Sequence, residues 1–175
     1  MARDVPEIRY VRRDGSNIAY QRWGTGDKVQ VFVPPLVSNL EVAWELPEYA
    51  ELFRRAAKVL DLITFDKRGT GLSDHGDGPA DFETHAADLI AIMDNEQVQT
   101  AGLVGFSEGG ILPLVAAALN PDRVTSVVTQ GTPVMGADME DLEARADPVN
   151  PVPTAKEQAD RYRAMLRGWA TADSA

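Results

Sequence analysis

The sequence predicts an α/β fold with a mostly parallel, twisted sheet flanked by helices, and two observations carry this prediction. In the middle of the chain, short apolar and β-branched runs alternate with longer runs of helical periodicity. Such alternation is typical of parallel strands joined by right-handed crossover helices. In addition, residues 105–110 (GFSEGG) join an apolar run to a helix-forming run. Since ligands bind at the carboxyl ends of strands in such sheets, this junction is where we expect a site.

Composition narrows the classes of function. The chain has 175 residues, 44% of them hydrophobic, which fits one globular domain with a sizeable core. A net charge of -10 argues against nucleic acid or an anionic membrane surface as a partner, because both bind clustered lysines and arginines. The absence of cysteine excludes disulfides, thiolate metal sites and a cysteine nucleophile. No signal peptide or membrane span is apparent, so we expect a cytoplasmic protein.

The first elements are expected to be strands. Residues 8–11 and 17–23 alternate in the manner of strands, and the Asp-Gly pair at 14–15 predicts a hairpin turn between them. A third strand is expected at 29–33. Two prolines at 34–35 end it, because proline cannot donate to a sheet ladder.

Helices and strands then alternate. We expect a helix over 46–57, a strand over 59–65, a helix from an Asp81 cap to about residue 96, and a buried strand over 124–129. The apolar face of the first of these helices is expected to carry Tyr49, Leu52, Phe53 and Ala56.

The sequence changes character after Val134. Acidic residues dominate as far as Asp147, and a proline-rich linker follows at 148–153. A last helix is expected from an N-cap at Thr154, with an apolar stripe that packs on its own domain or, alternatively, forms a dimer seam.

Ser107 is the candidate nucleophile. It lies in the pattern G-x-S-x-G, between an expected strand at 100–105 and an expected helix at 111–120. A serine on so sharp a turn is expected to adopt a strained backbone with φ > 0, which requires nearly side-chain-free residues two positions away on either side. Gly105 and Gly109 meet that requirement. The alternative interpretation is a glycine-rich loop with no chemistry.

Two backbone N–H groups are candidate oxyanion donors. The first belongs to Glu108, at the positive end of the helix that follows the serine. The second is expected from the loop after the third strand, where Leu36 is the first residue with an N–H after two prolines.

A general base is not evident. The two histidines, His75 and His85, both precede Ser107, whereas the order expected on this kind of sheet is serine, acid, histidine. We interpret His75 as a solvated loop residue and His85 as a surface or partly buried helical residue. No dinucleotide loop, phosphate loop or metal-ligand spacing is present, so no cofactor or metal is expected.

Together, residues 105–110 (GFSEGG) and 66–73 (DKRGTGLS) resemble the α/β-hydrolase superfamily. Residues 34–39 (PPLVSN), followed by Trp44-Glu45, resemble more closely the hydrolase-like domains joined to bacterial adenylate or guanylate cyclase domains. The resemblance implies an α/β-hydrolase fold with its core over 1–135 and the start of a helical cap over 136–175.

The resemblance also implies roles and departures. Ser107 matches the family nucleophile, Leu36 and Glu108 match the oxyanion donors, and Arg68 with Ser73 matches a loop that borders the site structurally. Pro35 stands where many relatives have glycine, which puts the conformation of that loop in question. The family's triad acid and histidine have no counterpart, so we expect a chain truncated after the sixth strand, associating with a second copy or with a missing carboxy-terminal half.

The expected function is therefore that of a serine hydrolase acting on a small ester or acyl substrate, inactive or very weak as the 175-residue chain alone. Two alternatives remain open. One is a non-catalytic sensor or interaction module associated with nucleotide cyclase signalling. The other is a cofactor-free haloperoxidase-like enzyme, which uses the same serine constellation.

Overall fold

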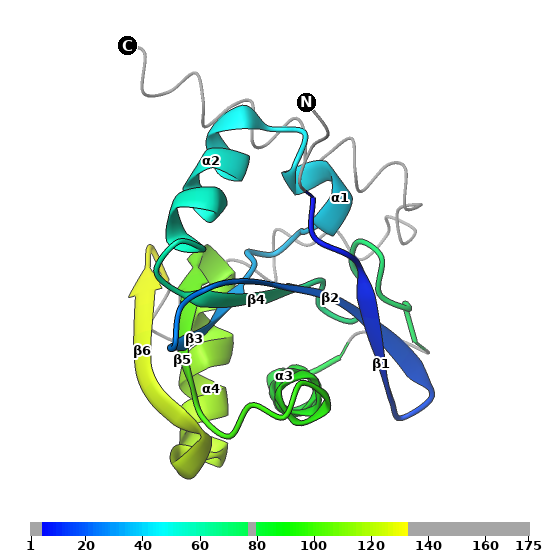
Figure 1. Cartoon of the computed structure of the whole chain (residues 1–175). Helices are drawn as coiled ribbons and strands as arrows, with labels where there is room; N and C mark the ends of the chain where they lie inside the picture. Colours follow the sequence, from blue (N-terminus) through cyan, green and yellow to red (C-terminus); the bar gives the residue numbers. More distant parts are fainter. Residues whose placement is uncertain (1–4, 77–79, 133–175) are drawn as a thin grey trace.

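The computed structural model describes residues 5–76 and 80–132 of the chain. Within these ranges six strands form one sheet in the order β1-β2-β4-β3-β5-β6. Figure 1 shows the sheet crossing the molecule with helices on either side of it. Strands β3 to β6 are parallel to one another, whereas β1 and β2 are antiparallel to their neighbours. This arrangement confirms the predicted, mostly parallel α/β architecture.

The chain opens with the predicted hairpin, made of β1 (Arg9–Arg13) and β2 (Ser16–Gly24). Its two turn residues, Asp14 and Gly15, have φ of 46° and 79°. Positive φ at both central residues is what a tight hairpin turn requires, because its twist then matches that of the strands. The Asp-Gly pair therefore predicted this turn correctly.

Strand β3 is the middle one of three parallel strands, β4, β3 and β5, whose carboxyl ends form the edge that we call the site-bearing edge. The strands are β3 (Val29–Val33), β4 (Asp61–Phe65), β5 (Ala101–Phe106) and β6 (Val124–Gln130). β3 pairs with β4 on one side and with β5 on the other. Val33 at the end of β3 lies opposite Gly105 of β5. The loops that follow β3, β4 and β5 therefore emerge side by side.

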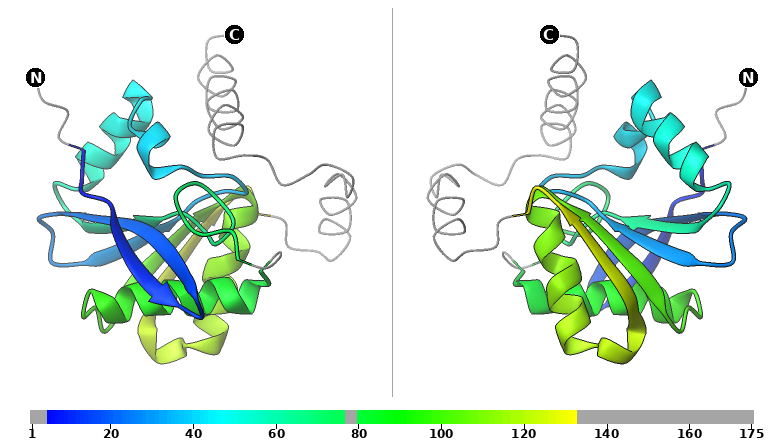
Figure 2. Two further views of the ribbon diagram at one scale, coloured as in Figure 1. Left: turned by 90° about the vertical axis from the view of Figure 1, so that its right-hand side faces the viewer. Right: turned by 90° about the vertical axis from the view of Figure 1, so that its left-hand side faces the viewer.

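Within the part of the chain that the structure describes, four α-helices cover the two faces of the sheet. They are α1 (Leu40–Ala43), α2 (Pro47–Ala56), α3 (Phe82–Asn95) and α4 (Ile111–Leu119). Figures 1 and 2 show α1 and α2 on one side of the sheet, and α3 and α4 on the other. Asp81 caps α3 as predicted, because its carboxylate accepts from the N–H of Thr84. Helix α1 was not predicted, although Asn39 caps it in the same way.

Alternation along the strands fills a core on each side. On β4, Ile63 belongs to the cluster that includes Leu89 of α3, whereas Leu62 belongs to the cluster that includes Phe53 of α2. Successive strand residues point to opposite faces, so one strand serves both cores. Each fully buried side chain of this size contributes about 1.5–3 kcal/mol to the stability of the fold.

Two expectations about burial were wrong. Strand β6 was predicted to be buried, but most of it is exposed, and Val128 is 56% exposed. The reason is its place in the described sheet, where β5 is its one neighbour. Leu52 was placed on the apolar face of α2, but it is 54% exposed while Phe53 is buried. Adjacent helix residues point about 100° apart, so both cannot face the sheet equally.

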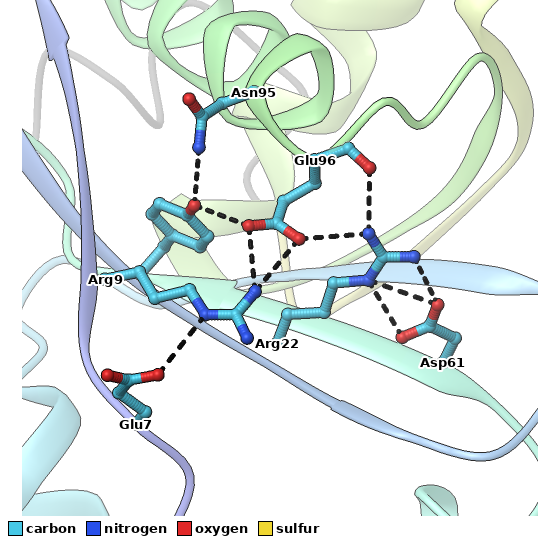
Figure 3. Close-up of polar contacts among 7 residues, drawn as sticks. Glu7, Arg9, Arg22, Asp61, Asn95 and Glu96 are labelled. Carbon is cyan, nitrogen blue, oxygen red and sulfur yellow. Dashed lines mark hydrogen bonds and ion pairs between the residues drawn. The ribbon is translucent and has the colours of Figure 1, made fainter.

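A charged network ties the hairpin to the end of α3, as Figure 3 shows. Glu96, which follows α3, accepts from the Tyr20 hydroxyl at 2.6 Å and from both Arg9 and Arg22 at 3.0–3.1 Å. Arg22 also pairs with Asp61, the first residue of β4, at 2.7 Å. The network therefore lies at the amino-terminal end of β4, at the opposite end of the parallel strands from residue 107.

Several expectations concern residues outside the described ranges. They are the boundary between 135 and 136, the linker over 148–153 and the helix beginning at Thr154. Among the helices of residues 5–76 and 80–132, none combines the length and apolar character needed to cross a membrane.

Candidate active site

Ser107 lies at a strained junction between β5 and the helix that follows. Its φ is 54°, in the left-handed region that residues other than glycine rarely adopt. A single 3-10 turn (Ser107–Gly110) connects β5 to α4, and Ser107 is exposed while Gly109 and Gly110 are buried. The predicted positive φ is confirmed. In the described ranges the other non-glycine residues with positive φ, Asp14 and Gln97, lie in a hairpin turn and after α3, away from this edge.

Close backbone approach explains the glycines around Ser107. A Cβ on Gly105 would lie 2.5 Å from the carbonyl oxygen of Gly109 and 2.6 Å from the Cα of Gly110. A Cβ on Gly109 would collide with the carbonyl group of Pro34 at the end of β3. The turn can therefore close against the neighbouring strand only with hydrogen at both positions.

The loop after β3 reaches the same edge as Ser107. Pro34 and Pro35 are buried, whereas Leu36 is 62% exposed. Because β3 and β5 are hydrogen-bonded neighbours in parallel register, Leu36 and Ser107 follow adjacent strand ends. The topology thus brings together the three residues singled out in the sequence, Leu36, Ser107 and Glu108.

The loop after β4 carries Asp66, a fully buried carboxylate. Its Oδ2 accepts from the N–H of Leu72 at 2.9 Å and from the N–H of Leu40 at 3.2 Å. Asp66 thereby joins its own loop to the first turn of α1. Burial raises the pKa of Asp66 to about 6, and the hydrogen bonds from the Ser38 side chain and from the N–H groups of Leu72 and Leu40 offset that effect only in part.

Arg68 anchors the same loop to the opposite face of the sheet. Its guanidinium makes a bidentate contact with Asp88 of α3, at 2.7 and 3.1 Å, and donates to the Ser16 hydroxyl at 2.7 Å. Arg13 also pairs with Asp88, at 3.1 Å. Ser73 accepts from the N–H of Ala19 at 2.8 Å and donates to the carbonyl oxygen of Asp66 at 2.6 Å. These contacts fit the structural role expected of Arg68 and Ser73.

Between these two anchors lies Lys67, which was not singled out from the sequence. Its Nζ lies 2.6 Å from Oε2 of Glu108, in an ion pair whose side chains are 5% and 16% exposed. The two residues are 41 positions apart, so no local spacing rule relates them. The signal in the sequence was an uninterrupted Asp-Lys-Arg run directly after a buried strand, where three charges need partners.

The two histidines differ in environment. His75 is exposed in its loop, as interpreted from the sequence. His85 is half-buried in α3, and its Nδ1 has no hydrogen-bond partner among the described residues. Burial lowers the pKa of His85, and the nearby Lys67 charge lowers it further. Within residues 5–76 and 80–132, no group of three or more histidine, aspartate or glutamate side chains could hold a metal ion.

A family comparison decides what this architecture is. Residues 31–167 match the family model described as the alpha/beta hydrolase fold, a range that begins in β3 and includes every site residue above. The chain belongs to the α/β-hydrolase family.

Relatives of this α/β-hydrolase span several activities by name. It is 31% identical over 121 residues to human "Serine hydrolase BPHL", which covers 67% of this chain and 40% of the relative. It is 30% identical over 160 residues to the "Non-heme chloroperoxidase" of Streptomyces lividans, and the match covers 87% of this chain and 52% of the relative. A solved structure titled "Est816 as an N-Acyl homoserine lactone degrading enzyme" superposes with a TM-score of 0.62 at 28% identity, covering 71% of this chain and 45% of that one. The chain thus spans about half the length of these relatives.

Proposed function

We propose that this α/β-hydrolase is a serine hydrolase acting on a carboxylic ester or similar acyl compound. Ser107 attacks the acyl carbon, and the backbone N–H groups of Glu108 and Leu36 stabilise the oxyanion that forms. The observation that carries this proposal is the backbone of Ser107, an exposed residue with positive φ directly after β5, which is the neighbour of β3 in the sheet. Strain of this kind persists where the surrounding structure holds it for a function. The relatives named as a serine hydrolase and a lactone-degrading enzyme support the reaction class.

The general base is the second part of the proposal. A serine hydroxyl needs a base oriented by a third group, and both histidines of this chain precede Ser107. We propose that the acid and the histidine come from outside these 175 residues. The chain alone then retains the contribution of the oxyanion hole and of binding, about 10³–10⁴ over the rate in water.

A fluorophosphonate probe tests the nucleophile. We expect peptide mass spectrometry of the labelled 175-residue chain to find the adduct on Ser107 well before any other serine, and Ser107→Ala to abolish that site. Ser126→Ala is the matched control, because Ser126 is an exposed serine on the neighbouring strand β6. Labelling of Ser107 at the rate of Ser126, both in the 175-residue chain and in a longer chain that supplies a histidine, would refute the proposal.

Haloperoxidase-like chemistry is a second candidate, which the chloroperoxidase relative favours. Here the acyl group on Ser107 passes to hydrogen peroxide in place of water, and the resulting peracid oxidises a halide. Bromination of a dione indicator in acetate buffer, with peroxide present and Ser107 intact, distinguishes it from ester hydrolysis alone.

A non-catalytic sensor or interaction module in the cytoplasm, of the kind joined to nucleotide cyclases, is the alternative outside the enzyme class. It is motivated by the residues at 34–39 and by the lack of a histidine after Ser107. Turnover of a short-chain aryl ester that disappears in Ser107→Ala would exclude it.

A further inference from the structure

A buried ion pair crosses the end of one strand to reach the turn that carries Ser107. Lys67 follows β4 and Glu108 lies in the 3-10 turn after β5, yet β4 and β5 are not neighbours in the sheet, because β3 lies between them. The Nζ–Oε2 contact of 2.6 Å therefore joins two loops across the carboxyl end of β3. No other ion pair among the described residues reaches the Ser107 turn.

Burial makes this pair a strong constraint on geometry. The Lys67 side chain is 5% exposed and that of Glu108 is 16% exposed. Two charges withdrawn from water gain little net stability, but removal of one leaves the other buried without a partner, which is strongly unfavourable. The Glu108 side chain is therefore held in one position as long as Lys67 is present.

The lysine itself is held from both sides. Asp66 before it is fixed by the N–H groups of Leu40 and Leu72, and Arg68 after it is fixed by Asp88. The Lys67 carbonyl oxygen also accepts from the Thr70 hydroxyl at 2.8 Å. The ammonium group thus extends from a backbone with little freedom to shift, and Glu108 is pinned to a rigid reference.

We propose that Lys67 is a positioning residue that fixes Glu108 so that its backbone N–H faces the oxyanion formed at Ser107. The inference rests on the proposed function, because it assigns a role to the same N–H. An oxyanion donor is effective only when it is held in place before charge develops. A side-chain anchor on the donor residue itself supplies that restraint, at a turn whose backbone is strained.

Amide hydrogen exchange tests the anchor without requiring activity. In the 175-residue chain, we expect Lys67→Met and Glu108→Gln each to speed exchange at residues 107–110 by about ten-fold or more, with the β1–β2 hairpin unchanged. Lys67→Arg should restore slow hydrogen exchange. The double variant in which the two charges are swapped, Lys67→Glu with Glu108→Lys, should also restore it. Arg55→Met is the matched control, because it breaks an exposed pair with Glu51. Unchanged exchange at 107–110 in both single variants would overturn the proposal.

Fluorophosphonate labelling then separates positioning from mere stability. We expect labelling of Ser107, relative to Ser126, to fall about ten- to hundred-fold in Lys67→Met and to recover in Lys67→Arg. A general loss of folding would change the labelling of Ser107 and Ser126 together, so it would not change their ratio in this way. If Ser107 shows no preferential labelling in the unaltered chain, the proposed function fails while the exchange result still decides the anchor. Normal labelling in Lys67→Met, despite faster exchange, would overturn the positioning role.

Discussion

Asp66 shows what one buried carboxylate does at the residue scale. It accepts from two backbone N–H groups, one in its own loop and one in the first turn of α1, and it has no exposed surface. Burial raises the pKa of Asp66 to about 6, so the folded chain binds this proton more readily than the unfolded chain does. Stability contributed by this group therefore increases as pH falls from above 6 towards 4, the reverse of the usual carboxylate.

Asp66→Asn should remove that pH dependence. Asparagine keeps an oxygen acceptor for Leu40 and Leu72 but cannot titrate. We expect the unaltered chain to gain about 1 kcal/mol of unfolding free energy relative to the variant between pH 8 and pH 5. Urea titrations at both pH values measure the difference. A constant difference across this range would show that Asp66 titrates normally.

Among the glycines of the described residues, Gly109 has the shortest distance from its Cβ position to a neighbouring backbone atom. Its Cβ position overlaps the carbonyl group of Pro34, a backbone atom that cannot rotate away. We expect Gly109→Ala to lower the unfolding free energy by about 1–3 kcal/mol and to reduce fluorophosphonate labelling of Ser107. Gly15→Ala is the control for labelling, because alanine there also strains the backbone, at a φ of 79°, but its Cβ meets nothing within 4 Å and the turn is remote from Ser107. Equal labelling in both variants would contradict this account.

Single residues also mark where sequence reasoning works. The strained φ of Ser107 and the cap at Asp81 follow from local chemistry, and both were predicted. The partnership of Lys67 with Glu108 depends on which strands are neighbours, and that information is not local. The nucleophile and donor roles of Ser107, Leu36 and Glu108 remain predictions.

At the scale of elements, helix α3 is tied to the site-bearing loop by Asp88. This carboxylate is 1% exposed and pairs with both Arg68 and Arg13, so it joins α3 to the loop after β4 and to the end of β1. Helix periodicity and the capping residue Asp81 together placed α3 correctly. Helix periodicity gave no reason to expect that Asp88 is buried, because its two arginine partners come from other elements.

Asp88→Ala should therefore be severely destabilising. Two arginines lose a buried partner, and we expect a loss of about 3–5 kcal/mol in unfolding free energy. Asp94→Ala provides the comparison, since Asp94 lies on the same helix, is 61% exposed and pairs with Arg123. Its loss should stay within about 1 kcal/mol. Denaturant unfolding of both variants decides, and similar losses would show that burial does not govern these pairs.

Element boundaries reflect the same division between local and non-local information. The strand at 29–33 was predicted to the residue, because β-branched composition and the two prolines define it. Helix α1 was missed since four residues carry too little periodicity. The exposure of β6 was missed because the neighbours of a strand cannot be read from its own residues.

At the scale of the whole molecule, the two ends of the parallel strands differ. One end gathers the residues proposed for chemistry, and the other carries the network centred on Glu96 shown in Figure 3. The alternation of strands and helices, together with the GFSEGG junction, predicted this architecture and the family that the comparison shows. The sequence also predicted that Ser107 follows the carboxyl end of a parallel strand, and it does follow β5.

The network at the far end should affect stability alone. Glu96→Ala removes the acceptor of Tyr20, Arg9 and Arg22, and we expect a loss of about 2–4 kcal/mol in unfolding free energy. Labelling of Ser107 under conditions where the variant stays folded should be unchanged. Thermal unfolding followed by circular dichroism gives the first quantity, and a parallel loss of labelling would show that the two ends are coupled.

The central claim is that Ser107 and two backbone N–H groups form one reaction site, and the most direct test is a crystal structure of the phosphonylated chain. We predict a phosphonyl group on the Ser107 oxygen, with its non-bridging oxygen about 2.7–3.1 Å from the nitrogens of both Leu36 and Glu108. An adduct on another residue, or a phosphonyl oxygen directed away from both nitrogens, would contradict the claim.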